Sequence, residues 1–504
     1  MDRTAKFIKN TLATGLMQVV AMISGFIIPK IMLMFYGSEI NGIVTSITQL
    51  ISYLTLLEAG LSGATVFSLY KPIADHDIYG INRILTAAKN LYYKTGHIFS
   101  CMVVLCAALY PFFVQTTTLD YEELFFLFLI LGINGVLEFY TLAKYRALLT
   151  ADQKTWVISL ASIIQIVLNI IIIASLAYAG FSIVIVRAAA VTAIFARTYL
   201  LWKYCRDHYN FLDFTVPPNN EAMNQRWDAL YLQILGAIHQ GAPILIATFL
   251  LSLLDVSIYA IFNLVILGLN SLLGIFMTGL TSGFGDLIAR GEREPFKKAF
   301  SEFEFIYTIT ITVIYSTMFF SFQPFISLYT KGSDISYYYP LFAFLMAWNG
   351  FAYNIKNPFG MLVISAGKYR ETRLPTTIQG AIELIGGIAL ALPFGLNGIV
   401  MASILSNVYR DIEFLFFAPR HLTHMPIGHT VKLWTVNTLL LIFAFWTNSL
   451  LPFPEMGDYL RWVIFSAFIC ILCGIAAVSI NAILFRHLAC STLARLIHMV
   501  KRSH

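Results

Sequence analysis

Charged residues are scarce in this chain. Asp, Glu, Lys and Arg make up 12% of its 504 residues, whereas 58% are hydrophobic and the mean hydropathy is +0.74. A soluble domain usually carries about 25% charged residues, which is enough to cover its surface with polar groups. The shortage of charge therefore excludes a soluble globular protein and indicates a membrane protein.

Cysteine is also rare, and its placement predicts neither a disulfide framework nor a metal site. Of the six cysteines, five lie in or beside hydrophobic stretches, and Cys205 lies in an expected cytoplasmic loop. Cys470 and Cys473 form one C-x-x-C pair, but a zinc site of this kind needs a second ligand pair. We interpret this pair as helix packing and expect no metal and no cofactor.

Long apolar stretches recur along the whole chain. A helix needs roughly 20 apolar residues to cross a bilayer, and fourteen stretches meet this length. We expect an all-α polytopic membrane protein in which the first span is retained rather than cleaved as a signal peptide. The predicted spans are residues 10–36, 42–69, 96–116, 122–143, 156–178, 181–203, 229–253, 256–286, 303–329, 339–363, 373–393, 396–418, 431–450 and 461–485.

The distribution of Lys and Arg predicts the orientation. With the N-terminus inside, most of the 33 cations fall in cytoplasmic segments, and the predicted outside segments hold Lys331 and Arg461 alone. This bias follows the positive-inside rule, so both termini are expected in the cytoplasm. Contact with anionic inner-leaflet lipid then explains the net charge of +6, and no nucleic-acid partner is expected.

An internal repeat predicts the domain organisation. Residue pairs separated by about 214 positions occupy equivalent spans: Pro29 and Pro243, Pro111 and Pro324, Asn134-Gly135 and Asn349-Gly350, and Gly180 and Gly395. Two six-helix lobes of the same orientation follow, as in transporters with parallel repeats, with an added C-terminal helix pair. The predicted parts are an N-lobe (1–205), a cytoplasmic linker (206–228), a C-lobe (229–420) and a C-terminal helix pair with a tail (421–504).

Polar residues follow one face of several predicted spans. Such stripes are typical of helices that line a water-filled path, although small residues also serve helix-helix contacts. The polar residues that we select as substrate-binding candidates are Gln18, Gln240, Asn270, Asn349 and Tyr353.

Two carboxylates lie near the centre of predicted spans, where an ionised group is costly unless it is protonated, paired or hydrated. Glu58 is the first candidate for a protonation or cation-coupling site, with a buried structural pair as the alternative. Glu383 and His239 complete the coupling candidates, although His239 also fits an interhelical hydrogen bond.

Four cations lie within predicted spans: Lys30, Arg187, Arg197 and Lys356. They could form a series of binding positions for an anionic headgroup of the cargo. Phosphate is the expected anion, because Lys and Arg commonly bind it. Alternatively, each side chain could extend to the membrane interface, since each lies about 10 Å or less from an end of its span at 1.5 Å per residue.

Two stretches carry a family resemblance. Residues 27–74, which begin IIPKIMLMFYGSEING, resemble the opening helices of Wzx-like polysaccharide-export flippases, and SGFGDLIARGEREPF, residues 282–296, resembles the end of their eighth helix. These flippases form a branch of the multidrug/oligosaccharidyl-lipid/polysaccharide exporter superfamily. The resemblance implies transport of an oligosaccharide linked to a polyprenyl diphosphate, such as undecaprenyl diphosphate, across the bacterial cytoplasmic membrane by alternating access. It also implies membrane lipids, a coupling H⁺ or Na⁺ and polysaccharide assembly proteins as partners.

Three alternatives are open. The first alternative is a flippase for lipid II or a teichoic-acid precursor. Extra C-terminal helices also occur in the similar lipid II flippases, but those proteins have arginines on helices 1, 2 and 8. Predicted spans 2 and 8 have no Lys or Arg within the membrane here. A cation-coupled multidrug antiporter would suit Glu58 and Glu383. A membrane glycosyltransferase or polymerase is disfavoured, because the predicted outside loops are too short for a catalytic domain, so we expect no enzyme.

Overall fold

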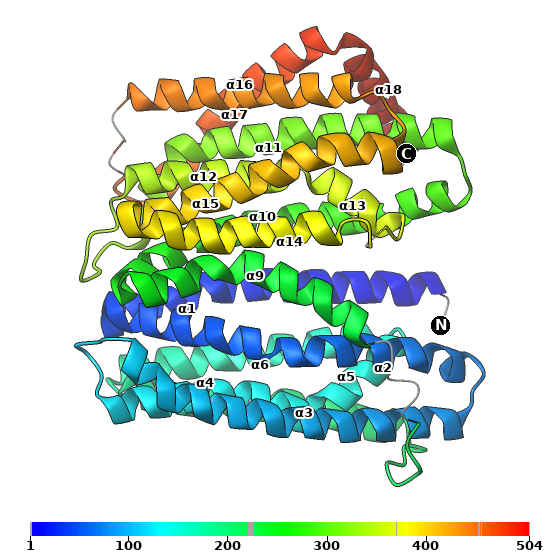
Figure 1. Ribbon diagram of the computed structural model, residues 1–504, viewed down its shortest axis with the longest axis vertical. Coiled ribbons are helices and arrows are strands. Elements are labelled where there is room, and N and C mark those ends of the chain that lie inside the picture. The colour runs from blue at the N-terminus through cyan, green and yellow to red at the C-terminus, as the bar shows by residue number, and fades with distance from the viewer. Residues whose placement is uncertain (1–2, 220–225, 369, 452–453, 455, 503–504) are drawn as a thin grey trace. The chain divides into compact units, whose positions relative to one another are not determined.

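The structure is a computed structural model that describes residues 3–219, 226–368, 370–451, 454 and 456–502, and its regular secondary structure in these residues is helical (Figure 1). The chain forms two compact units. The first comprises Met1–Ala260 with Gly332–Asp334, and the second comprises Ile261–Lys331 with Ile335–His504. The internal repeat predicted a different division, into two lobes joined by a linker at residues 206–228. These lobes stay a prediction about the internal symmetry of the chain.

The first unit is built from antiparallel helices. Its elements are α1 (Arg3–Leu54), α2 (Leu56–Ala74), α3 (Ile78–Phe113), α4 (Tyr121–Leu137), η1 (Glu138–Leu142), α5 (Ala143–Ala151), α6 (Thr155–Tyr178), α7 (Ile183–Val191), α8 (Ala193–His208) and α9 (Arg226–Leu250). The core contains Phe99, Tyr110 and Phe128, whose rings contribute to one buried hydrophobic cluster.

The second unit contains the remaining helices. They are α10 (Leu253–Ala289), which begins in the first unit, α11 (Arg293–Tyr329), α12 (Pro340–Ile355), α13 (Asn357–Ser365), α14 (Arg373–Ala381), η3 (Ile382–Gly386), α15 (Gly387–Ala418), η4 (Pro419–Thr423), α16 (Ile427–Ser449), α17 (Tyr459–Leu484) and α18 (Arg486–Arg502). Helices α16 and α17 both pack on α11, as a C-terminal pair added to the unit. Phe262 lies at the centre of an aromatic group, with its ring centroid 5.3 Å from that of Phe322 and 5.1 Å from that of Phe342.

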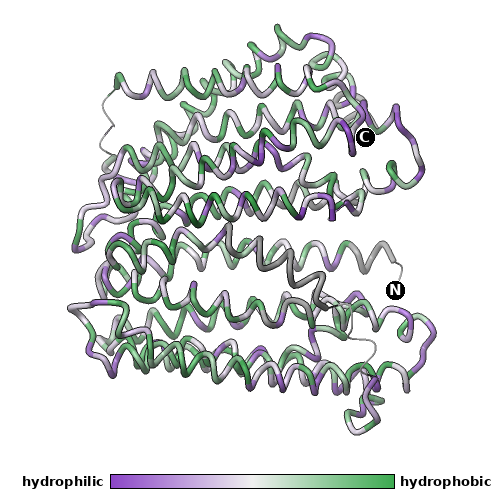
Figure 2. The backbone as a smooth tube through the Cα atoms, viewed as in Figure 1, coloured by the Kyte–Doolittle hydropathy of each residue, from purple (hydrophilic) through white to green (hydrophobic). Residues whose placement is uncertain are grey.

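The helices have the length and composition of membrane spans. Ten described helices are long and apolar enough to cross a membrane. Of these, Arg373–Thr423 contains two predicted spans, and Ile8–Leu54 contains the predicted span 10–36 and the first part of 42–69, which continues in α2. The predicted span 229–253 falls on α9, and 339–363 falls on the consecutive helices α12 and α13. All fourteen predicted spans therefore lie on helical segments, and the predicted all-α membrane fold is confirmed. Hydrophobic residues cover most of the helix lengths, whereas hydrophilic ones are frequent at helix ends and in loops (Figure 2).

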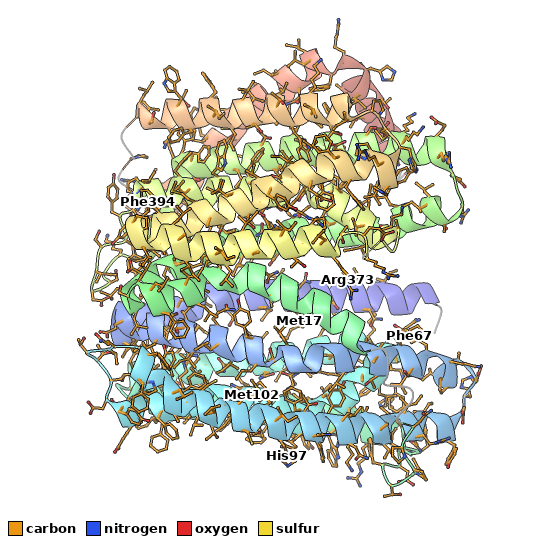
Figure 3. All side chains as sticks on the ribbon, viewed as in Figure 1. Met17, Phe67, His97, Met102, Arg373 and Phe394 are labelled. Atoms are coloured by element: carbon orange, nitrogen blue, oxygen red, sulfur yellow. The ribbon has the colours of Figure 1, made fainter. Side chains whose placement is uncertain are left out.

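Two glycines reverse the chain between consecutive spans. Gly37 (φ +85°) divides α1, and Gly395 (φ +57°) divides α15. Only glycine adopts a positive φ without steric cost, so these positions can join two spans without a longer loop. Phe394 precedes the second turn, and Arg373 begins the span that leads to it (Figure 3).

Aspartate caps mark where several helices begin. The Asp77 carboxylate accepts a hydrogen bond from Gly80 N at 2.8 Å, and Asp458 accepts one from Arg461 N at 2.8 Å. Each bond satisfies a backbone N–H that has no acceptor within the helix. These polar caps therefore fix where α3 and α17 begin.

The turn at Gly395 leaves no space for a side chain at position 398, which is a glycine. A Cβ atom at this position would lie 1.9 Å from the Leu390 carbonyl oxygen, on the opposite arm of the turn. We expect Gly398→Ala to destabilise the protein by about 1–3 kcal/mol, because the two helix backbones must separate. Thermal unfolding in detergent measures the effect. Gly428→Ala is the control, since a Cβ there has no neighbour within 4 Å, and an equal loss of stability in both variants would contradict the prediction.

Candidate functional site

The second unit contains a broken helix, and several buried polar side chains lie at the break. Helix α12 ends at Ile355 and α13 begins at Asn357. Lys356 lies between them and is both the C-cap of α12 and the N-cap of α13. Pro358 has no N–H to donate, which explains why the hydrogen-bond ladder does not continue through this point. Broken helices in transporters frequently expose such polar groups at binding sites.

Lys356 is buried rather than extended to an interface. The residue is 6% exposed, and its Nζ donates to Asn407 Oδ1 at 2.7 Å and to the Ala352 carbonyl oxygen at 3.1 Å. Asp411 Oδ1 lies 3.6 Å from the same nitrogen, and the Tyr353 ring centroid lies 5.2 Å away. The alternative in which Lys356 reaches the membrane interface is therefore wrong in this structure.

Amide side chains surround the ammonium on the side of α14 and α15. Asn407 Nδ2 donates to Asn349 Oδ1 at 2.9 Å, and Gln379 Nε2 donates to Asn407 Oδ1 at 3.3 Å. Asn407 is 1% exposed and Gln379 is 8% exposed, so these bonds form inside the unit. The predicted residues Asn349, Tyr353 and Lys356 are thus brought together with two amides from other helices.

A second amide cluster holds the other side of the break. Asn354 Nδ2 donates to Asn270 Oδ1 on α10 and to the Tyr315 hydroxyl on α11, both at 2.8 Å. The Tyr307 hydroxyl donates to Asn354 Oδ1 at 3.2 Å, and Asn357 Nδ2 donates to the same oxygen at 2.9 Å. The predicted residue Asn270 therefore fixes the position of the break from a neighbouring helix.

Glu383 lies in the same unit, on the π-helical segment η3. It is 2% exposed, and its Oε1 accepts a hydrogen bond from the Ser403 hydroxyl on α15. A π-helical turn adds a residue to the helix and is frequent at functional sites. The predicted coupling residue is therefore buried in an irregular helix and held by a hydroxyl group.

The first unit contains a separate cluster of opposite charges. Arg146 on α5 forms a close ion pair with Glu138, the first residue of η1, and lies 3.8 Å from Glu58 Oε1 on α2. Arg197 on α8 lies 3.8 Å from Glu138 Oε1 and donates to Gln165 Oε1 at 3.3 Å. Two carboxylates and two guanidinium groups offset each other, which favours the interpretation of Glu58 as part of a structural pair.

The other sequence-predicted residues are not joined to these clusters by described contacts. Lys30 and Arg187 are partly buried in the first unit, and Arg187 Nε has no described hydrogen-bond partner. The side chains of Gln18 and Gln240 are exposed. The side chain of His239 lies outside the part of the structure that is described.

Sequence reasoning missed the charged partners. Asp411 lies four residues after Asn407 on α15, and Glu138 lies eight residues before Arg146 across η1. A carboxylate inside a predicted span is a signal that could have identified Asp411 and Glu138. Among the described residues, no group of three or more His, Cys, Asp and Glu is placed to hold a metal ion.

Several solved structures of membrane transporters have the same fold as this chain, at low sequence identity. The chain is similar to the lipid II flippase MurJ in an inward closed conformation, with 14% identity, a TM-score of 0.70 and coverage of 95% of this chain and 99% of that one. It is also similar to an inward-facing multidrug resistance MATE family transporter of the MOP superfamily, with 13% identity, a TM-score of 0.57 and coverage of 86% and 98%. A MOP superfamily transporter from Pyrococcus furiosus matches with 14% identity, a TM-score of 0.53 and coverage of 87% and 96%.

These similarities show that the chain shares the fold of these transporters, and together with the apolar helices they indicate a multi-pass membrane protein. No protein-family model matches the chain. No curated protein sequence matches it either. The predicted Wzx-like branch is compatible with these neighbours but is not distinguished by them.

The charge cluster of the first unit predicts an ordered series of stability losses. Arg146→Met leaves Glu138 and Glu58 without their nearest cation, and we expect a loss of about 2 kcal/mol, between the values for exposed and buried pairs. Glu58→Gln should lose less, since its oxygen lies 3.8 Å from the guanidinium nitrogen. Thermal unfolding in detergent tests the order.

The control is Arg290→Met, which breaks an exposed pair with Asp286 and should change stability by about 1 kcal/mol or less. If Arg146→Met were no more destabilising than this control, the cluster would not be a structural element.

Proposed function

We propose that this chain is a flippase that moves a polyprenyl-diphosphate-linked oligosaccharide, the repeat unit of a cell-surface polysaccharide, from the inner to the outer leaflet. The proposed mechanism is alternating access of two lobes in the bacterial cytoplasmic membrane, with both termini in the cytoplasm. No chemical step on the cargo is part of this proposal, so the protein is not an enzyme.

The observation that carries the proposal is the buried Lys356 at the helix break. Lys356 is a strong donor for phosphate, and Asn349 and Asn407 supply the amide groups that hydrogen-bond to sugars and phosphates. A drug/cation antiporter has less use for a buried cation, because its cargo is itself cationic. The cation therefore favours an anionic cargo.

The extent of the structural similarity agrees with this choice. The match to a lipid II flippase covers 95% of the chain, whereas the matches to the multidrug transporter and the Pyrococcus furiosus transporter cover 86% and 87%. Similarity over nearly the whole chain includes the C-terminal helices, which suit a cargo with a long lipid tail. A lipid II or teichoic-acid precursor is accordingly the second candidate cargo.

The remaining site residues are proposed in the same terms. The diphosphate would also be bound by three further cations, Lys30, Arg187 and Arg197. The saccharide would be contacted by Gln18, Gln240, Asn270 and Tyr353. Of these cations, Arg197 is already 3.8 Å from Glu138, so its availability for cargo depends on that pair opening. Glu383 and His239 are the proposed coupling residues for H⁺ or Na⁺. Glu58 is proposed with them, and its availability for a coupling ion depends on its contact with Arg146 opening.

Depletion of the protein tests the proposal directly. We expect a polyprenyl-diphosphate oligosaccharide to accumulate in the lipid extract, as measured by mass spectrometry, and to resist labelling from outside intact cells. The mass of the accumulated lipid identifies the saccharide and separates the two candidate cargoes. An unchanged lipid pool would contradict the flippase proposal and favour a cation-coupled multidrug antiporter.

Substitution of Lys356 tests the site. Lys356→Ala should reduce transport by about tenfold or more at unchanged expression, because a buried charge-assisted contact to the cargo is lost. Lys356→Arg should retain part of the activity, since it keeps the charge. Lys331→Ala, in the predicted outside loop, is the matched control, and full transport by Lys356→Ala would exclude Lys356 from cargo binding.

A further inference from the structure

The ammonium group of Lys356 has incomplete hydrogen bonding. It carries three N–H donors, and two acceptors, Asn407 Oδ1 and the Ala352 carbonyl oxygen, lie within 3.1 Å of Nζ. Asp411 Oδ1 lies 3.6 Å from Nζ, beyond hydrogen-bond distance. The pair with Asp411 is thus held by charge attraction without the short contact of 2.7–2.9 Å that a charge-assisted hydrogen bond normally shows.

The Asp411 carboxylate is correspondingly poorly satisfied. Its side chain is 13% exposed, and Oδ1 is buried without a hydrogen-bond partner among the described residues. A buried carboxylate oxygen without a donor loses its hydration and gains little in return. The contact between Asp411 and Lys356 is therefore weak for its degree of burial, and a better acceptor could replace it.

Neighbouring charges do not provide Asp411 with another close partner among the described residues. Arg410, the preceding residue, forms its own ion pair with Glu413 at 2.8 Å. The nearby amides Gln379 and Asn349 are engaged with Asn407. The described ion pair of Asp411 is thus with Lys356, and removal of Asp411 would change the charge balance of this one cation.

We propose that Asp411 acts as an internal substitute for the anionic group of the cargo. In the empty state it occupies Lys356, and a phosphate oxygen of the cargo displaces it when the broken helix opens. The inference rests on the proposed function, because it requires a cargo with a diphosphate group. Asp411 is then a positioning residue that sets the affinity of Lys356 for the anion and prevents an uncompensated buried cation between transport cycles.

The exchange is favourable in chemical terms. A phosphate group offers several strong acceptor oxygens, whereas the Asp411 carboxylate makes one contact at 3.6 Å. Asn407 keeps its own bonds to Asn349 and Gln379, so the amide frame around Lys356 persists during the exchange. One weak ion pair is replaced by one with direct hydrogen bonds.

Binding of farnesyl diphosphate to the purified full-length protein in detergent tests the inference, with farnesol as the uncharged control ligand. Asp411→Asn removes the competing anion, so we expect the dissociation constant for farnesyl diphosphate to fall by about tenfold. Asp411→Glu brings a carboxylate closer to Nζ, so the dissociation constant should rise. Lys356→Met should remove the diphosphate-dependent binding, and farnesol should bind all variants equally.

Asp286→Asn is the matched control, because it neutralises an aspartate in an exposed pair and should bind like the natural protein. Unchanged or weaker binding by Asp411→Asn would overturn the inference, as would tighter binding by Asp411→Glu. If Asp411→Asn does not fold, the Asp411→Glu result decides alone. Lipid accumulation after depletion would uphold the flippase proposal even if these binding results failed.

Discussion

The constraint on which this structure depends is the cost of an ionised group inside an apolar bundle. A charge that leaves water must find a partner or change its protonation state, because attraction in a low-dielectric interior only offsets the lost hydration when the geometry is close. The two units meet this constraint differently. The first places two acids, Glu58 and Glu138, beside two arginines and includes one close ion pair, between Arg146 and Glu138, whereas the second places Lys356 against Asp411 at 3.6 Å.

The same constraint shapes the backbone around these groups. Glu138 begins one π-helical segment and Glu383 lies in another, while Lys356 lies where α12 and α13 separate. Each irregularity shifts the direction of a side chain that a continuous helix would point elsewhere. Amides then secure the irregular backbone, as Asn354 does by bonding to Asn270 and Tyr315. The buried polar side chains and the helix irregularities therefore occur at the same places and stabilise each other.

The sequence predicted the helices well, because the length of an apolar stretch is a local property. The fourteen spans and the neighbouring candidates Asn349, Tyr353 and Lys356 follow from residues close together in the chain. The partners could not be predicted in the same way: Asp411 lies 55 positions from Lys356, and Arg146 is 88 positions from Glu58. Their pairing depends on which helix faces meet, and a single sequence with many small residues does not determine this.

The observed ion pairs also change the interpretation of Glu58 and Lys356, two charged residues that lie within predicted spans. Glu58 suggests coupling because it lies near the centre of a predicted span, and the structure supplies the paired alternative, with Arg146 at 3.8 Å. Lys356 suggests an anion site because it is a cation within a predicted span, and it too has an opposite charge nearby. The difference lies in the contacts: Arg146 is held closely by Glu138, whereas the Asp411 oxygen nearest to Lys356 has no described hydrogen bond. The buried Asp411 oxygen without a described hydrogen bond is the reason why the proposed exchange with an incoming anion is assigned to the second unit.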